Sequence, residues 1–240
     1  MQLDVSKLGY QELNAVLRDT KDRDITLEGC IGQRFIAAGT SGKHVKITGI
    51  PGNALGAYLN GSVIETAGNA QDAVGDTMND GEIIVHGNIG DAAGYAMRGG
   101  RIFVQGNAGY RAGIHMKAYQ DKVPVMVIGG RTGSFLGEYQ AGGIIIVLGL
   151  SGGERPIVSN FPCTGMHGGK LFLRSDCAGI HFPHQVHHRI ASADELAEIR
   201  SYVEEYCRHF GGDPVELLNA EFTIVTPDSG NPYQQMYVAN

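Results

Sequence analysis

A short run of β-branched residues that ends in glycine recurs along this chain at an almost constant interval. The successive intervals are 20, 19, 19, 19, 23 and 20 residues. The terminal glycines are Gly29, Gly49, Gly68, Gly87, Gly106, Gly129 and Gly149. Each run is only a few residues long and rich in valine and isoleucine, as in Ile83-Ile84-Val85, which is typical of β-strands. The repeat therefore predicts one such strand per period and constrains the fold more than any other feature.

The period excludes most repeat architectures. Ankyrin, tetratricopeptide and propeller repeats need roughly 33 to 45 residues, and the spacing of leucine-rich repeats is missing. We therefore predict an all-β fold, a right-handed parallel β-helix of about seven coils in which tight turns join two or three short strands per coil. At about 4.8 Å per coil, such a solenoid would be roughly 33 Å long.

Glycine is abundant, with 36 residues among 240, about twice the ordinary share of ~7 %. We expect glycine to supply the positive φ that tight turns need, and asparagine to form a ladder of amide hydrogen bonds at one corner of successive coils. The residues assigned to these structural turns are Gly49, Gly68, Asn69, Gly87, Asn88, Gly106, Asn107, Gly129 and Gly149.

The ends of a solenoid expose strand edges, so we expect helical caps at both ends. Residues 9–18 form the first predicted helix and residues 192–210 the second, which opens with the capping box Ser192-Ala-Asp-Glu195. The predicted organisation is an N-terminal cap (1–24), the β-helix (25–180), and a C-terminal cap helix, strand and tail (181–240). Residues 117–124 account for the long interval as an insertion at a coil corner.

Composition narrows the function classes. The formal net charge of −6 and the lack of a long basic run argue against a nucleic-acid partner. The longest unbroken apolar run, Ile144 to Leu148, is too short to cross a bilayer, and no apolar leader is visible, so we expect a cytoplasmic protein. The four cysteines form no C-x-x-C pair, which excludes iron–sulfur and zinc-ribbon sites and favours reduced thiols.

Three segments of the chain resemble the GXGXG domain, the C-terminal right-handed β-helix of the glutamate synthase large subunit. They are Gly68-Asn-Ala-Gln-Asp-Ala-Val-Gly75, Gly99-Gly-Arg-Ile102 and the run from Glu138 to Val147. The resemblance extends from about Gly29 to Arg174. The same module occurs as a stand-alone chain and as one of the subunits of formylmethanofuran dehydrogenase.

This resemblance implies a non-catalytic scaffold subunit of a glutamate synthase-type oxidoreductase complex, with no catalytic, cofactor or metal site and no activity of its own. The partners would be amidotransferase-like and synthase-like subunits, and FMN and iron–sulfur clusters would reside in the latter. The alternative within the family is the equivalent subunit of a formylmethanofuran dehydrogenase-type complex. A homo-oligomeric arrangement of this chain is compatible with either kind of complex.

Alternatives of another class rest on short motifs. Gly149-Leu-Ser151-Gly-Gly153 fits the G-x-S-x-G pattern of a serine hydrolase with Ser151 as nucleophile, although Pro156 follows where a helix should begin. His184 and His188 would share a face if their segment were helical and could then ligate a metal, but Pro183 disfavours a helix. Arg98, Arg101 and Arg111 could grip an anion or a partner's carboxylates, or simply be solvated.

Overall fold

The computed structural model describes residues 1–153 and 155–229 of the chain. Its helices are α1 (Tyr10–Asp19), α2 (Ala193–Phe210) and α3 (Pro214–Leu218). Its strands are β1 (Gln2–Asp4), β2 (Asp24–Ile31), β3 (His44–Ile50), β4 (Asn60–Thr66), β5 (Asp80–Val85), β6 (Arg101–Val104), β7 (Val125–Ile128), β8 (Ala141–Val147), β9 (Gly168–Leu173), β10 (Val186–Ile190) and β11 (Thr223–Pro227). Each predicted β-branched run overlaps one of the strands β2 to β8.

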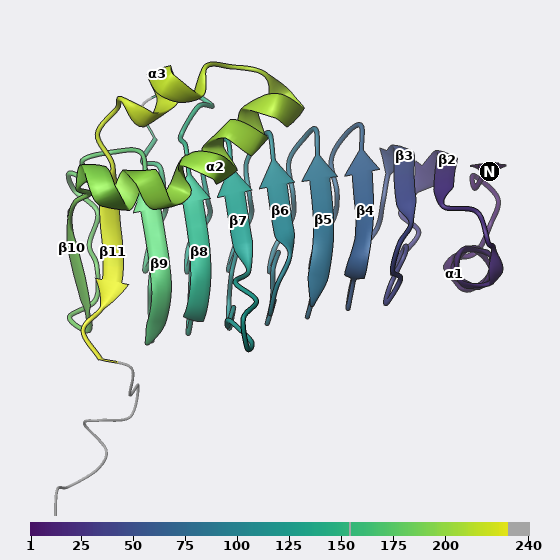
Figure 1. The fold of residues 1–240 in the computed structure, drawn as a ribbon, viewed down its shortest axis with the longest axis horizontal. Coiled ribbons are helices and arrows are strands. Elements are labelled where there is room, and N and C mark those ends of the chain that lie inside the picture. Colours follow the sequence, from purple (N-terminus) through teal and green to yellow (C-terminus); the bar gives the residue numbers. More distant parts are fainter. Residues whose placement is uncertain (154, 230–240) are drawn as a thin grey trace, which may run out of the picture.

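The strands form one sheet in the order β1-β2-β3-β4-β5-β6-β7-β8-β9-β11-β10. Every pair from β1 to β9 is parallel, and β11 pairs antiparallel with both β9 and β10. Figure 1 shows the successive strands side by side along the long axis, each followed by a connection that returns behind the sheet. The near-constant repeat is thus the length of one strand and one return segment.

The prediction of a right-handed parallel β-helix is wrong. The described residues form a single open, mostly parallel sheet of 11 strands, which is not closed by second and third strands in each repeat. Between the return segments, the described residues form only isolated bridges such as Ala70↔Ile89 and Ile89↔Ala108. The reason lies in the backbone of those segments, which is not extended.

The return segments share a backbone pattern in which φ is positive at three alternating positions. The first positions are Phe35, Ala54, Ala73, Ala92, Arg111, Phe135 and Phe161; the middle positions are Ala37, Gly56, Gly75, Gly94, Gly113, Gly137 and Cys163; the third positions are Gly39, Tyr58, Thr77, Ala96, His115, Tyr139 and Gly165. Left-handed residues interrupt an extended strand, so each return is a chain of tight turns. Backbone hydrogen bonds still link each return to the next, for example Ala73 N–H to Asp91 O at 2.8 Å.

Two hydrophobic cores lie on opposite faces of the sheet. The larger core fills the space between the sheet and the return segments, with buried residues such as Ile47, Ile64 and Ile102. The second core lies between the other sheet face, where Phe103 and Phe172 are buried, and helices α2 and α3. Strand β7 is consequently buried at all four residues, whereas β3 alternates between exposed and buried residues over its first four positions.

The expectation of a helical cap at each end is also wrong. Helix α1 packs Leu13 and Leu17 into the first end of the large core, but α2 lies across the outer face of the sheet instead of covering its other end (Figure 1). The apolar stripe of α2 matches the apolar outer faces of β6 to β9, and burial of this area stabilises the docked helix. The antiparallel pair β10–β11 occupies the far end of the sheet.

The local signals for α2 are present in the structure. The Ser192 hydroxyl accepts a hydrogen bond from the Glu195 backbone N–H, while the Glu195 carboxylate accepts one from the Ser192 backbone N–H. Arg189 also pairs with Glu195, and this hydrogen bond together with the capping contacts lowers the pKa of Glu195 to about 2. Gly211 ends the helix with a φ of +84°. The start and end of α2 are therefore fixed by its own sequence.

The insertion at residues 117–124 forms a tight loop between the fifth return segment and β7. Tyr119 and Lys122 exchange two backbone hydrogen bonds of 3.1 Å, and the side chain of Tyr119 is largely exposed. Lys122 Nζ lies 2.9 Å from Asp80 Oδ2, which ties the loop to the start of β5. The hydrogen bond and the positive charge of Lys122 lower the pKa of Asp80.

Candidate partner-binding surface

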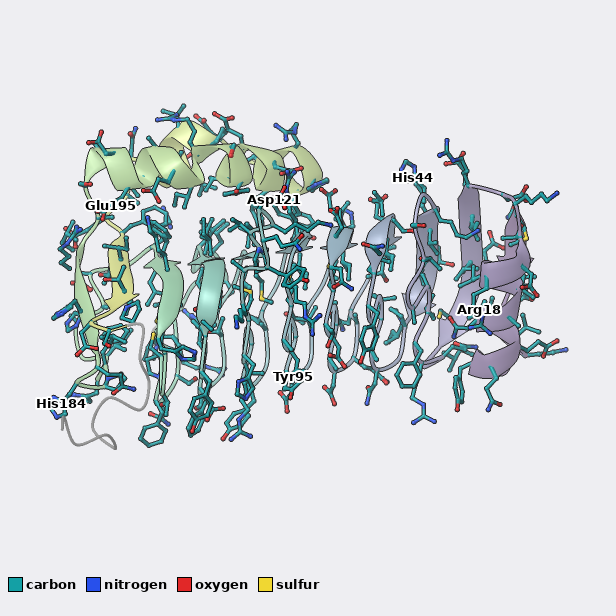
Figure 2. All side chains as sticks on the ribbon, turned by 60° about the horizontal axis from the view of Figure 1, so that its bottom comes forward. Arg18, His44, Tyr95, Asp121, His184 and Glu195 are labelled. Atoms are coloured by element: carbon teal, nitrogen blue, oxygen red, sulfur yellow. The ribbon has the colours of Figure 1, made fainter. Side chains whose placement is uncertain are left out.

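The return segments carry aromatic side chains on the side of the molecule that faces away from the sheet. We define the aromatic surface as Tyr95, Tyr110, His115, Phe135, Tyr139 and Phe161. Phe161 is 62 % exposed and Tyr139 43 % exposed, which is unusual for rings of this size. In Figure 2, Tyr95 points outward from the lower edge of the stacked segments.

The rings form two contacting rows across consecutive return segments. In one row, Phe135 has its ring centroid 5.2 Å from those of both Tyr110 and Phe161. In the other row, His115 is stacked on Tyr139 at 5.2 Å and meets Tyr95 edge-on at 5.9 Å. Phe135 and Phe161 occupy the first position of successive return segments, and His115 and Tyr139 occupy the third. Tyr110 and Tyr95 each lie one residue before the corresponding position of their own segment.

An ion pair with a buried carboxylate lies between the two rows. Arg111 Nε lies 2.6 Å from Glu138 Oε2, and the Glu138 side chain is only 8 % exposed. The Arg111 guanidinium also lies over the rings of Tyr110 and Phe135, at 4.8 and 5.2 Å from their centroids. The hydrogen bond to the Glu138 carboxylate raises the pKa of Arg111, so this cation stays charged at every physiological pH. The ion pair and ring contacts hold the aromatic surface in one arrangement.

The asparagine ladder connects four consecutive repeats through three side-chain hydrogen bonds. The Asn69 amide oxygen accepts from the backbone N–H of Asn88 at 2.8 Å, and the Asn88 amide oxygen accepts in the same way from Asn107. The Asn107 oxygen accepts from the backbone N–H of Arg131, again at 2.8 Å. Each side chain therefore satisfies a backbone donor of the next repeat.

A second ladder was missed by sequence reasoning. The Asp72 carboxylate accepts from the backbone N–H of Asp91 at 2.9 Å, and that of Asp91 accepts from Tyr110 at 2.8 Å. Asn53 precedes them in the same role at 3.3 Å. The 19-residue spacing of Asn53, Asp72 and Asp91 was the available signal.

The glycines assigned to turns divide into two kinds. Gly49 and Gly149 have φ of +104° and +66°, whereas Gly68, Gly87, Gly106 and Gly129 are not among the positive-φ glycines. A Cβ atom at Gly87 would lie 2.5 Å from Asn69 Oδ1, and one at Gly106 would lie 2.5 Å from Asn88 Oδ1. These two positions require glycine because the asparagine ladder passes close to their backbone.

Ser151 is exposed and its hydroxyl lies 3.0 Å from the Asn107 amide oxygen. An asparagine amide cannot accept a proton as the base of a hydrolase must. Ser151 lines a cavity of about 460 Å³ together with Arg131 and Thr132, and none of the described residues that line it is a histidine or an acid. The described residues thus do not assemble a nucleophile and its base around Ser151.

His184 and His188 are both exposed, and His188 belongs to strand β10 instead of a helix. His188 stacks on Phe182 at 4.7 Å, while His184 lies at the periphery of the molecule in Figure 2. Within the described part of the chain, the one group of three potential metal ligands in mutual reach is instead Glu82, Glu205 and His209. The helical face that would have paired the two histidines does not exist.

The three arginines do not meet in one site. Arg101 pairs with Glu205 of α2 at 2.7 Å, and Arg111 pairs with Glu138. The Arg98 guanidinium lies 6.0 Å from the centroid of Tyr119 in the inserted loop. Each therefore has a separate partner, and a common anion site is not formed.

Comparisons with known proteins identify relatives of the whole chain. The family model for the GXGXG motif matches residues 11–228. A protein of Methanocaldococcus jannaschii described as uncharacterized is 43 % identical over 248 residues, which cover 98 % of this chain and 95 % of the relative. In the described ranges, none of the helices has the length and apolar character that crossing a membrane requires.

The fold is similar to that of a solved structure. It is a chain of the formyltransferase/hydrolase complex from Methylorubrum extorquens, determined in complex with methylofuran. The TM-score is 0.66 with 18 % sequence identity, and the alignment covers 91 % of this chain and 84 % of the other. At this identity the likeness concerns the fold alone.

Proposed function

Because the chain belongs to the GXGXG motif family, we propose that it is a non-catalytic structural subunit that binds other polypeptides of a larger enzyme complex. The aromatic surface is the observation that carries this proposal. Contiguous exposed rings are costly in water, and aromatic residues are enriched in protein–protein interfaces. The solved neighbour, which is one chain of a complex, supports the same role.

The preformed geometry of this surface favours recognition by a protein partner. The two rows of rings and the Arg111–Glu138 pair are held by contacts within the chain, so binding would require little ordering of side chains. Tyrosine, phenylalanine and arginine together are the residue types that dominate the binding energy of many interfaces. The occupant we propose is therefore a folded partner subunit that buries these rings.

For the identity of the complex, we propose a glutamate synthase-type oxidoreductase in which this chain organises an amidotransferase subunit and an FMN/iron–sulfur synthase subunit. The residues that support this are the three segments similar to the glutamate synthase domain, such as Gly99-Gly-Arg-Ile102. FMN and the clusters would be held by the partner. The four free, buried cysteines fit the cytoplasmic location that we propose for the complex.

A second candidate is the corresponding subunit of a formylmethanofuran dehydrogenase-type complex. The observation that favours it is the solved neighbour, which belongs to a formyltransferase/hydrolase complex bound to methylofuran. Its shared fold covers most of this chain. The two candidate complexes contain different partner subunits, so the identity of the bound subunits distinguishes between them.

The test is purification of the full-length tagged chain from its native cell, followed by mass spectrometry and cofactor analysis. Co-purification of an amidotransferase-like chain, together with flavin absorbance and iron, would support the first candidate. Partners that contain molybdenum or tungsten would support the second candidate. A chain that is recovered alone, or that shows catalytic activity alone, would contradict the structural role.

Substitutions in the aromatic surface test the docking site itself. Tyr139→Ser together with Phe161→Ser should reduce recovery of the partner at least tenfold, because both rings would lose their interface contacts. Val215→Ser is the matched control, since Val215 is 54 % exposed but lies on α3, away from the return segments. Equal recovery of the partner with both variants, at unchanged thermal stability, would place the interface elsewhere.

A further inference from the structure

Three side chains with metal-ligating atoms meet where the end of α2 crosses the sheet. Glu82 comes from β5, and Glu205 and His209 come from α2, where their spacing of four residues puts them on one helix face. One ligand atom from each residue lies within 4.8 Å of the others. None of these residues takes part in the aromatic surface or in the ladders.

The Nε2 atom of His209 has no hydrogen-bond partner among the described residues. This atom is buried, and it lies 3.4 Å from Glu82 Oε1. A buried polar atom without a hydrogen bond is uncommon in folded proteins and costs about 1–3 kcal/mol. The nitrogen therefore lies close to a carboxylate oxygen without forming a hydrogen bond to it.

The charges around Glu82 are also poorly balanced. Burial, reinforced by repulsion from Glu205, raises the pKa of Glu82 to about 7. The side chains of Glu82 and Glu205 are only 18 % and 14 % exposed, so their two carboxylates lie close together and partly shielded from water. The positive groups nearby are Arg101, which binds Glu205 through Nη1 at 2.7 and 2.8 Å, and Arg208, at 4.0 Å from Glu205.

We propose that Glu82, Glu205 and His209 form a binding site for a divalent transition-metal ion, with Zn²⁺ the best match. Zinc binds nitrogen at about 2.0–2.1 Å and carboxylate oxygen at about 2.0–2.2 Å, so two ligand atoms in a tetrahedral site lie about 3.3–3.5 Å apart. The Glu82 Oε1 to His209 Nε2 distance of 3.4 Å fits this separation. An ion between them would occupy the unpaired nitrogen and neutralise the crowded carboxylates.

The surroundings meet the other requirements of such a site. Arg101 orients the Glu205 carboxylate, as hydrogen-bonding groups outside the ligands of metal sites commonly do. Glu82 and Arg101 also line a cavity of about 520 Å³, so one of the three ligands can be approached from this cavity. The ion would connect α2 to the sheet, so its binding would stabilise the docked helix.

The experiment uses the full-length protein stripped with EDTA and then titrated with Zn²⁺. We expect saturable binding by calorimetry and a rise in Tm of about 5 °C or more at a free Zn²⁺ concentration of ~100 times Kd. Glu82→Gln and His209→Gln should each weaken binding at least tenfold. His86→Gln is the matched control and should bind like the wild type, because His86 already pairs with Glu65 at 2.9 Å.

Co²⁺ provides a readout on the unmodified protein that needs no variant. Visible d–d bands without a sulfur-to-metal charge-transfer band would support a site of nitrogen and oxygen ligands. A charge-transfer band would show that a thiol such as Cys207 holds the ion, and would overturn the proposal. Wild-type affinity in folded Glu82→Gln and His209→Gln variants, or the absence of Zn²⁺ binding, would overturn it as well.

Discussion

The middle glycines of the return segments provide a direct test of how these segments pack. Gly75 has a φ of +69°, and a Cβ atom built there would lie 2.5 Å from Cδ1 of the fully buried Ile102. Gly39 has nearly the same φ of +68°, but a Cβ atom there would meet nothing within 4 Å. Substitution of each by alanine therefore separates the cost of the backbone conformation from the cost of the steric clash.

The expected magnitudes differ clearly. Gly39→Ala should lower the free energy of unfolding by about 1–2 kcal/mol, the cost of a left-handed L-residue. Gly75→Ala should lower it by about 2–5 kcal/mol, because overpacking of the core adds roughly 1–3 kcal/mol. The difference between the two variants isolates the contact of the return segment with the sheet.

Urea denaturation followed by circular dichroism measures both variants, and equal m-values are required for the comparison. A loss in Gly75→Ala no larger than that in Gly39→Ala would refute the argument. It would mean that Ile102 moves without cost, and hence that the middle glycines are present only for their φ. Gly68→Ala is a suitable reference, because Gly68 has neither a positive φ nor a Cβ contact closer than 3.6 Å.

Two further predictions concern Glu82 and the asparagine ladder. The pKa of Glu82 is raised from 4.5 to about 7 in the folded protein, so the folded state favours the protonated carboxyl group. The contribution of this group to stability is therefore complete below pH 4.5 and is lost as the pH rises through about 7. In the presence of EDTA at pH 8, the free energy of unfolding of Glu82→Gln, measured by urea denaturation, should therefore exceed that of the wild type by roughly 1–3 kcal/mol. Near pH 4 the two free energies should be equal. A variant that is less stable than the wild type at pH 8 would contradict this. Asn88→Ala should lower the free energy of unfolding by about 1–2 kcal/mol, because it removes the acceptor of the Asn107 backbone N–H. Hydrogen exchange at the Asn107 amide should become faster. Unchanged exchange at this amide would show that the ladder does not protect the backbone.

The strands were predictable because the signal is local and repeated. Runs such as Ile83-Ile84-Val85 combine β-branched residues with a constant interval, and parallel pairing in chain order follows from equal connections. The capping box at Ser192 likewise located the start of α2. What the same signals could not supply was the conformation between the strands, and there the predicted β-helix failed.

The return segments were misread because positive φ falls largely on residues that do not indicate it. Alanine, threonine, tyrosine, histidine, arginine and phenylalanine occupy the first and third positions, as at Ala73, Thr77 and Tyr139. Only glycine is a recognised signal for this conformation, and here it marks chiefly the middle position. The corner glycines, such as Gly87, instead reflect close approach of the neighbouring repeat.

The location of α2 was hidden for a different reason. Its amphipathic pattern fits a cap on the end of a sheet as well as a cover on its face. The evidence for the face lay in another part of the chain, where strands β7 and β8 are apolar at consecutive positions and must be buried on both sides. The meeting of Glu82 with Glu205 and His209 depends on this placement, so the residues of the proposed metal site could not be paired from sequence spacing.

The distribution of strained residues along the returns supports the proposed docking role. At the first positive-φ position, the first segment carries Phe35, which contacts the ring of Tyr10 within the fold. The second to fourth segments carry alanine, whereas the fifth to seventh carry Arg111, Phe135 and Phe161. A bulky L-residue gains nothing over glycine in this conformation, and it costs about 1–2 kcal/mol in strain. Retention of large side chains there requires a benefit that the isolated fold does not provide, and these three residues belong to the aromatic surface or lie over its rings. A run of large side chains at three successive strained positions is what a surface selected for binding a partner would show.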